Sequence, residues 1–217
     1  MKLHRANTKP DWELVAPASR NPWQRLAAST NGVVTPGNVL SVIGVGLVGV
    51  GLTYVHGGQL WRGLWFLAVG RLCDLADGIA AERTGTKSPL GEAVDASLDK
   101  LAAFAALVVF ALAGVMPWGF ALLIGLQNGA TAVLSAIAKS TKRVIHPVSA
   151  GKIGGAIEWG ALLCFVLGKA VHGTPADMLT VAAYSLAFIA IGLNTLATSW
   201  YVRAIYTQPG RTGKRRG

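Results

Sequence analysis

Six long apolar segments follow one another along the chain, separated by short polar stretches or by stretches that contain glycine and proline. With its flanks, each segment is long enough for a transmembrane helix, which needs about 20 predominantly apolar residues. The pattern therefore predicts an all-α, polytopic membrane protein with six transmembrane helices. We expect these helices at residues 39–55, 60–81, 93–115, 118–138, 153–170 and 178–206.

Polar ends flank this apolar region. Residues 1–30 mix tryptophans with basic side chains and prolines, and a short interfacial helix near residues 21–30 fits them as well as a disordered basic tail does. They contain no hydrophobic signal-peptide core, so we expect no cleaved signal. The predicted organisation is an N-terminal basic, interfacial segment (1–30), a six-helix membrane domain (31–206) and a basic C-terminal tail (207–217).

The composition supports a membrane protein over a soluble one. The chain is 52% hydrophobic and only 14% charged, whereas about 25% of the residues of a soluble domain are charged. In a soluble protein, the net charge of +10 would suggest binding to nucleic acid. Here the positive-inside rule and anionic lipid headgroups explain that charge. We therefore expect membrane lipids as partners and no nucleic acid.

The basic residues also predict the orientation of the six helices. With these spans, 16 Lys and Arg residues fall on one side of the membrane, and only Arg62 and Lys169 fall on the other. Lys and Arg accumulate in cytoplasmic loops. We therefore expect both termini, and the loop that follows the second helix, on the cytoplasmic side.

The first apolar segment contains Gly44, Gly46 and Gly49, which match the pattern G-x-G-x-x-G. A dinucleotide-binding loop needs a βαβ unit around this pattern, and no such unit is evident here. We expect instead that these glycines let another helix approach closely.

Four carboxylates interrupt the second and third predicted helices: Asp74, Asp77, Asp95 and Asp99. Spacings of three and four residues place each pair on one face of a helix. If the two helices face each other, the four carboxylates meet in one pocket, where only a bound cation makes their mutual repulsion and burial tolerable. Hard oxygen ligands favour Mg²⁺, Mn²⁺ or Ca²⁺ over zinc.

This stretch resembles the signature of the CDP-alcohol phosphotransferases, D-x2-D-G-x2-A-R-x8-G-x3-D-x3-D. The residues that match it are Asp74, Asp77, Gly78, Ala81, Gly91, Asp95 and Asp99. One position departs from it, because Glu82 stands where the family usually has Arg, and Arg83 follows.

The resemblance implies metal-dependent transfer of a phosphatidyl group from CDP-diacylglycerol to an alcohol, with release of CMP. It implies that Mg²⁺ or Mn²⁺ is held by the four aspartates, with Asp99 close to the metal as the catalytic general base. It also implies a homodimer in a bacterial cell membrane, with the site facing the cytoplasm. The residues expected to bind the CDP donor are Asp74, Gly78, Ala81, Arg83 and Gly91.

The segment 149–155 is similar to a Gly-Lys segment of phosphatidylglycerophosphate synthases and eukaryotic-type cardiolipin synthases, although Gly155 and Glu158 replace their Thr and Gln. Arg143, Lys152 and Arg203 would then clamp a phosphate on the acceptor; the alternative is that they only orient the chain in the membrane. Glycerol 3-phosphate, giving phosphatidylglycerophosphate, is the expected acceptor. Alternatives are phosphatidylglycerol, giving cardiolipin, or inositol phosphate. A divalent-cation transporter or an inactive relative is the alternative from a different class.

Overall fold

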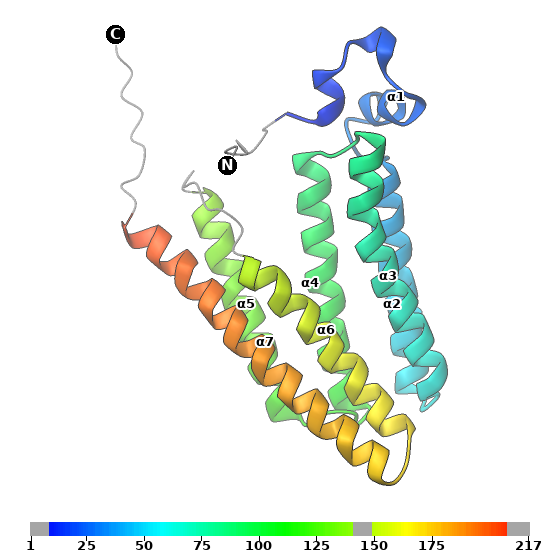
Figure 1. Ribbon diagram of the computed structural model, residues 1–217, viewed down its shortest axis with the longest axis vertical. Helices are drawn as coiled ribbons and strands as arrows, with labels where there is room; N and C mark the ends of the chain where they lie inside the picture. The colour runs from blue at the N-terminus through cyan, green and yellow to red at the C-terminus, as the bar shows by residue number, and fades with distance from the viewer. Residues whose placement is uncertain (1–8, 141–148, 208–217) are drawn as a thin grey trace. The chain divides into compact units, whose positions relative to one another are not determined.

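The computed structural model describes residues 9–140 and 149–207, and in these ranges it contains seven α-helices and no strand (Figure 1). The prediction of an all-α protein is confirmed. One helix corresponds to each of the six predicted apolar segments, although α4 ends at Leu112, before the predicted end at residue 115. The elements are η1 (Asp11–Leu14), η2 (Pro17–Ser19), α1 (Pro22–Ser29), α2 (Pro36–His56), α3 (Leu60–Thr84), α4 (Pro89–Leu112), α5 (Trp118–Ser140), α6 (Ser149–Ala170) and α7 (Thr174–Thr207).

The helices form two compact units, which divide between Ala105 and Ala106 inside α4. The first unit contains the N-terminal elements, α2, α3 and the first part of α4. The second unit contains the end of α4 together with α5, α6 and α7.

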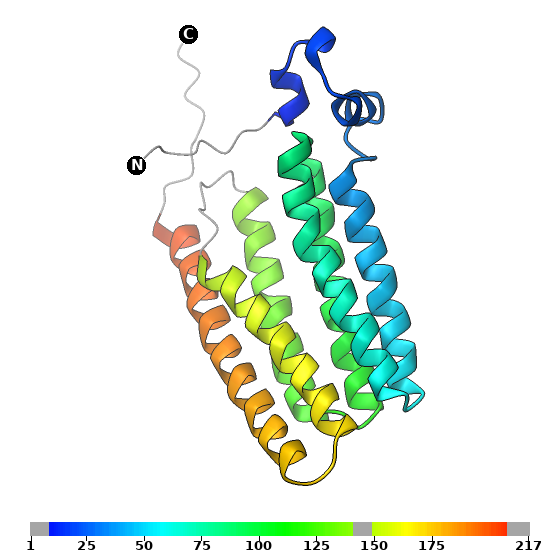
Figure 2. The ribbon, with the colours of Figure 1, turned by 45° about the vertical axis from the view of Figure 1, so that its right-hand side comes forward.

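In the first unit, α2 and α3 lie side by side along their length (Figure 2). Glycines allow this close approach, because a Cβ atom on Gly70 would lie 2.7 Å from the carbonyl oxygen of Gly44, and one on Gly51 would lie 3.0 Å from that of Gly63. The expected role in close packing is therefore confirmed for Gly44. For Gly46 and Gly49 the described part of the chain shows no such contact, since a Cβ on either would meet nothing within 4 Å.

The connection between α3 and α4 is a loop of only four residues, Gly85 to Ser88. Gly85 ends α3 in the left-handed conformation, with φ of 62°. Ser88 lies before α4, and its hydroxyl accepts a hydrogen bond of 2.9 Å from the backbone N–H of Gly91. This loop is shorter than the gap between the predicted spans 60–81 and 93–115, and it keeps the aspartate-bearing parts of α3 and α4 close together.

The N-terminal segment, residues 9–30, packs on this loop. Asn21 and Gln24 form a capping box at the start of α1, and the Trp12 side chain is buried. The short helix expected near residues 21–30 is confirmed. The alternative, a disordered tail, is wrong for residues 9–30.

In the second unit, α7 packs on α5 and α6. Phe120, Phe165, Tyr184 and Phe188 form an aromatic cluster with ring centroids 5.0–6.3 Å apart. The second unit also buries a charged residue, because Glu158 on α6 is only 5% exposed.

Large apolar side chains face outward while polar ones are buried. On α3, Leu72 and Leu75 are 62% and 64% exposed, whereas Asp77 is 6% exposed. In the described ranges, three helical stretches are long and apolar enough to cross a bilayer, namely Pro36–His56, Ile153–Ala170 and Thr174–Arg203. Since α3 and α4 carry the charged residues of the motif, their composition alone does not mark them as spans.

Candidate active site

The carboxylates of α3 and α4 meet in the first unit. Asp74, Asp77 and Asp95 each direct one oxygen to a common place, and these oxygens lie within 4.8 Å of one another. The sequence prediction that the two pairs face each other is supported by this geometry for three of the four residues. Asp99 is not part of this group.

A residue of α2 holds the Asp77 side chain of α3 through a hydrogen bond. The Ser41 hydroxyl on α2 donates a hydrogen bond to Asp77 Oδ2 and also lies 3.1 Å from the carbonyl oxygen of Gly37. Both Ser41 and Asp77 are buried. Sequence reasoning missed Ser41, because nothing in the α2 segment indicates which residue will face the aspartates.

Arg71 connects the first and the last aspartate of the motif. Its Nη2 lies 2.8 Å from Asp74 Oδ2, and its Nη1 donates to Asp99 Oδ1 at 2.6 Å. The guanidinium is therefore shared between a residue of the carboxylate group and the expected base. Since the guanidinium group is mostly shielded from solvent, with the side chain 17% exposed, it offsets part of the negative charge of the site.

The group of three carboxylates fits a divalent cation. Oδ1 of Asp95 is buried without a hydrogen-bond partner among the described residues. A buried acceptor of this kind is costly unless it is paired, and a cation coordinated by the three carboxylates would pair it. The donors are all carboxylate oxygens, which suits Mg²⁺ or Mn²⁺.

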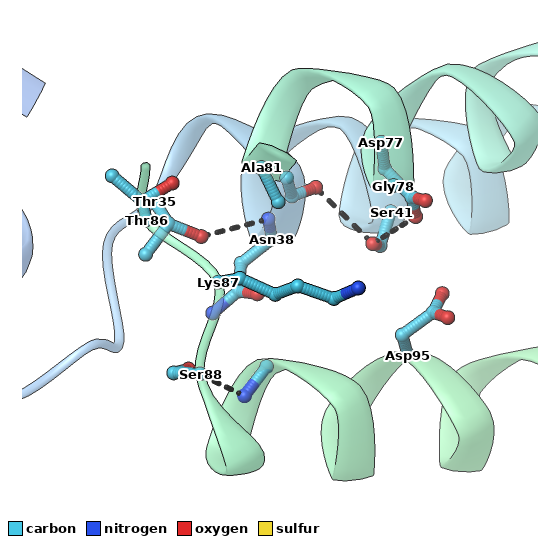
Figure 3. Close-up of a pocket in the computed structure, with 12 residues that line it drawn as sticks. Thr35, Asn38, Ser41, Asp77, Gly78, Ala81, Thr86, Lys87, Ser88 and Asp95 are labelled. Atoms are coloured by element: carbon cyan, nitrogen blue, oxygen red, sulfur yellow. Dashed lines mark hydrogen bonds between the residues drawn. The ribbon is translucent and has the colours of Figure 1, made fainter. Parts of the chain in front are cut away.

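A pocket adjoins these carboxylates (Figure 3), with an empty volume of about 400 Å³ that includes open solvent. It is bordered by the start of α2, the aspartate-bearing parts of α3 and α4 and the loop between them. The lining residues are Thr35, Gly37, Asn38, Ser41, Asp77, Gly78, Ala81, Thr86, Lys87, Ser88, Gly91 and Asp95.

Three of the residues expected to bind the donor line this pocket: Gly78, Ala81 and Gly91. A Cβ on Gly91 would lie 3.0 Å from Asn38 Oδ1, whereas one on Gly78 would meet nothing within 4 Å. Asp74 belongs to the carboxylate group but does not line the pocket. Arg83 is exposed and does not line it either.

The polar residues of α2 and of the loop were not predicted as site residues. Thr35 followed by Pro36 is a recognisable helix start, and the Thr35 hydroxyl indeed accepts a hydrogen bond of 3.1 Å from Asn38 N. That signal gives the position of a helix end, but not the loop that the end will meet. Lys87 falls in the unspecified part of the motif, where the spacing carries no chemistry.

The residues expected to bind the acceptor all lie in the second part of the chain. Arg143 and the side chain of Lys152 lie outside the described residues, and Arg203 is exposed near the end of α7. Glu158 accepts hydrogen bonds from Asn128 Nδ2 at 2.7 Å and from Asn194 Nδ2 at 3.3 Å. This carboxylate therefore joins α5, α6 and α7.

Outward-facing apolar helices around buried carboxylates are characteristic of membrane proteins that bind polar ligands inside the bilayer region. Comparison with known families specifies this class further, since the family model of CDP-alcohol phosphatidyltransferases matches residues 34–200. The chain therefore belongs to the CDP-alcohol phosphatidyltransferase family and is an integral membrane enzyme that acts on a CDP-alcohol. The matched range includes every residue that lines the pocket. No curated protein matches the chain.

Proposed function

We propose that the protein transfers the phosphatidyl group of CDP-diacylglycerol to glycerol 3-phosphate, releasing CMP and forming phosphatidylglycerophosphate. The observation that carries this proposal is the meeting of Asp74, Asp77 and Asp95 beside a pocket with small residues in its wall. Family membership supplies the CDP-alcohol donor and the alcohol acceptor. The identity of both substrates is the proposed part.

Asp74, Asp77 and Asp95 would hold Mg²⁺ or Mn²⁺, and a cation bound there polarises phosphoryl oxygens and offsets the charge of the pyrophosphate. The small residues of the pocket leave room for the CDP part of the donor. In the reaction, the acceptor oxygen forms a bond to the lipid-side phosphorus while the bond from that phosphorus to the bridging oxygen breaks. CMP leaves with the electron pair of that bond.

Asp99 takes the proton of the acceptor hydroxyl in this scheme. The contact with Arg71 is made through Asp99 Oδ1, so we assign the proton to the other carboxylate oxygen. Arg71 orients the base relative to Asp74, because one guanidinium contacts both side chains. A positioned carboxylate base contributes about 10²- to 10⁴-fold to the rate.

The acceptor is assigned from the basic residues of the second half of the chain. Arg143, Lys152 and Arg203 would bind the phosphate of glycerol 3-phosphate, since charge-assisted contacts suit a phosphate group. Phosphatidylglycerol and inositol phosphate are the competing acceptors. The proposed assembly is a homodimer in the cell membrane, with the pocket and both termini on the cytoplasmic side.

The test is CMP release by the purified protein in lipid vesicles that contain CDP-diacylglycerol, with each acceptor supplied in turn. We expect turnover with glycerol 3-phosphate and Mg²⁺, and none in excess EDTA. Asp77→Ala and Asp95→Ala should lower kcat/KM at least about a hundredfold, since even residues that only support metal ligands are worth 10- to 100-fold.

Asp177→Ala is the matched control, because Asp177 is an exposed carboxylate in the first turn of α7. Its activity should equal that of the unchanged protein. Full turnover in EDTA would rule out the metal-dependent mechanism. Turnover with a different acceptor alone would replace glycerol 3-phosphate, and no CMP release with any acceptor would reject the proposed reaction.

A further inference from the structure

The loop between α3 and α4 contributes a cation to the pocket. Lys87 is the one Lys or Arg among the pocket-lining residues of the described chain. Figure 3 shows its side chain extending through the pocket toward the end where Ser41, Asp77 and Asp95 lie. The remaining polar lining consists of carboxylates, hydroxyls and an amide, so Lys87 alone supplies a full positive charge from this wall.

Position 82 carries a negative charge, from Glu82, where the family signature usually has an arginine. Glu82 and its neighbour Arg83 are both exposed and do not line the pocket. A pyrophosphate in the pocket would carry negative charge close to the carboxylates of Asp77 and Asp95, which line it. An ammonium group beside it would therefore offset charge that the metal leaves uncompensated.

The N-terminal segment, residues 9–30, holds the loop that carries Lys87. The backbone N–H of Asp11 donates to the carbonyl oxygen of Lys87 itself at 3.0 Å. Asn21 Nδ2 donates to the carbonyl oxygen of Thr84 at 3.0 Å, and Gln24 Nε2 donates to that of Gly85 at 3.2 Å. Three residues of this segment thus hold the backbone at Lys87 and in the two residues Thr84 and Gly85 that precede it.

The N-terminal segment is itself held in place by buried and hydrogen-bonded side chains. Trp12 is 4% exposed. A Cβ on Gly32 would lie 2.7 Å from the Trp12 ring, which leaves room for glycine alone at this packed position. The Gln24 side chain also completes the capping box of α1 through a 3.1 Å contact with Asn21 N. A buried anchor and a capped helix give the hydrogen-bond donors defined positions.

We propose that Lys87 binds the pyrophosphate of the CDP donor and that the N-terminal segment is a positioning element that holds Lys87 for this contact. The inference rests on the proposed function for the identity of the donor. It adds a binding residue outside the signature and gives residues 9–30 a role in substrate affinity.

The first experiment measures CDP binding to the full-length protein in the presence of Mg²⁺, by calorimetry, together with the KM for CDP-diacylglycerol. Lys87→Ala should raise the Kd for CDP and the KM for CDP-diacylglycerol about tenfold to a hundredfold, the range expected for a charge-assisted hydrogen bond. Lys87→Arg should retain most of the affinity. The KM for the acceptor should stay the same in both variants.

Two other substitutions separate this contact from a general effect of positive charge. Lys9→Ala removes an exposed lysine of the N-terminal segment and should leave CDP binding unchanged. Arg83→Ala tests the competing cation next to Glu82, and it should change CDP affinity less than Lys87→Ala does. Unchanged CDP affinity in Lys87→Ala, or a larger loss in Arg83→Ala, would overturn the assignment.

The positioning role is tested with a matched pair at Asp11. Asp11→Pro removes the backbone N–H that donates a hydrogen bond to the carbonyl oxygen of Lys87, whereas Asp11→Ala keeps this N–H. We expect weaker CDP binding in Asp11→Pro only, and no further loss when it is combined with Lys87→Ala, because the N–H acts through the lysine. Additive losses in the double variant, or equal losses in both Asp11 variants, would refute the positioning role.

The outcomes distinguish this inference from the proposed function. If CDP binding depends on Lys87 but no acceptor gives CMP release, the reaction assignment fails and the pyrophosphate contact stands. If CMP is released and Lys87→Ala changes only the KM for the acceptor, the reaction stands and Lys87 belongs to the acceptor instead. If the unchanged protein does not bind CDP, the inference fails.

Discussion

Ser41 illustrates how a single hydroxyl on one helix supports a carboxylate on another. Its hydrogen bond holds one oxygen of Asp77, and Asp77 contributes one oxygen to the group that it forms with Asp74 and Asp95. Groups that orient a metal ligand in this way typically contribute 10- to 100-fold to metal affinity or activity.

We therefore predict that Ser41→Ala raises the Mg²⁺ concentration needed for half-maximal CMP release about tenfold to a hundredfold. Loss of the hydroxyl lets the Asp77 carboxylate rotate away from the position that coordinates the metal. The measurement is a Mg²⁺ titration at saturating donor and acceptor.

Ser97→Ala serves as the control for this titration. Ser97 is an exposed serine on α4 whose hydroxyl only donates to the carbonyl oxygen of Ala93, at 2.7 Å. Its Mg²⁺ requirement should not change. An unchanged requirement in Ser41→Ala as well would show that Ser41 does not orient a metal ligand.

At the scale of single residues, the sequence predicted the aspartates because their spacing is periodic on helices. It did not predict Ser41, Lys87 or the N-terminal contacts. These residues come from segments that are separate in the sequence, and only tertiary packing brings them to the pocket. Arg71 was not predicted as a site residue either, and its position between Asp74 and Asp99 follows from the helix pairing.

Among the elements, the pair of α2 and α3 determines where the aspartates lie. Gly70 is buried at their contact, and a Cβ there would also lie 2.8 Å from a side-chain carbon of Val48. The two backbones would have to separate to admit even a methyl group. Such a shift would reach the Ser41–Asp77 hydrogen bond, which joins the same two helices.

Gly70→Ala should therefore lower the free energy of unfolding by about 1–3 kcal/mol, the usual cost of overpacking. It should also reduce activity at 25 °C, since the carboxylates move with α3. The decrease is measurable as a lower midpoint of thermal unfolding in detergent.

Gly46→Ala is the matched control on α2, because its Cβ would meet nothing within 4 Å. Alanine favours a helix more than glycine does, so the stability of this variant should stay the same or rise slightly. If both variants unfold at the same temperature as the unchanged protein, the close packing of α2 against α3 does not require a glycine at position 70.

The sequence predicted the helices themselves well, since long apolar segments leave few alternatives in a membrane. Their ends were harder to place. For example, α3 continues three residues beyond the predicted 60–81 span and stops at the left-handed Gly85. The apolar pattern ends before the helix does, because the last turn of α3 is polar and is supported by the N-terminal segment.

For the whole molecule, the distribution of positive charge predicts the orientation in the membrane. Cysteine labelling tests it in a variant that lacks Cys73 and Cys164, the two free cysteines. We expect Ser19→Cys to react with an impermeant reagent only after permeabilisation. His56→Cys and His172→Cys should react in intact cells, since these exposed residues end α2 and follow α6.

The two histidine positions act as controls for each other, because the six-span arrangement places both on the side poor in Lys and Arg. Labelling of Ser19→Cys in intact cells would reverse the predicted orientation. Labelling of only one histidine position would change the number of spans.

The three-helix contact at Glu158 has a consequence for how the protein is made. Membrane helices leave the ribosome in order, so α5 is present when α6 enters the bilayer and α7 is not. A lone charged side chain at the centre of a helix opposes insertion by roughly 2.5–3.5 kcal/mol on a biological scale. Of the two asparagines, Asn128, which contacts one carboxylate oxygen, is therefore synthesised before Glu158, and Asn194 can donate to Glu158 only after synthesis has passed it. Insertion of α6 thus depends on the helix already made, and the final helix closes the assembly.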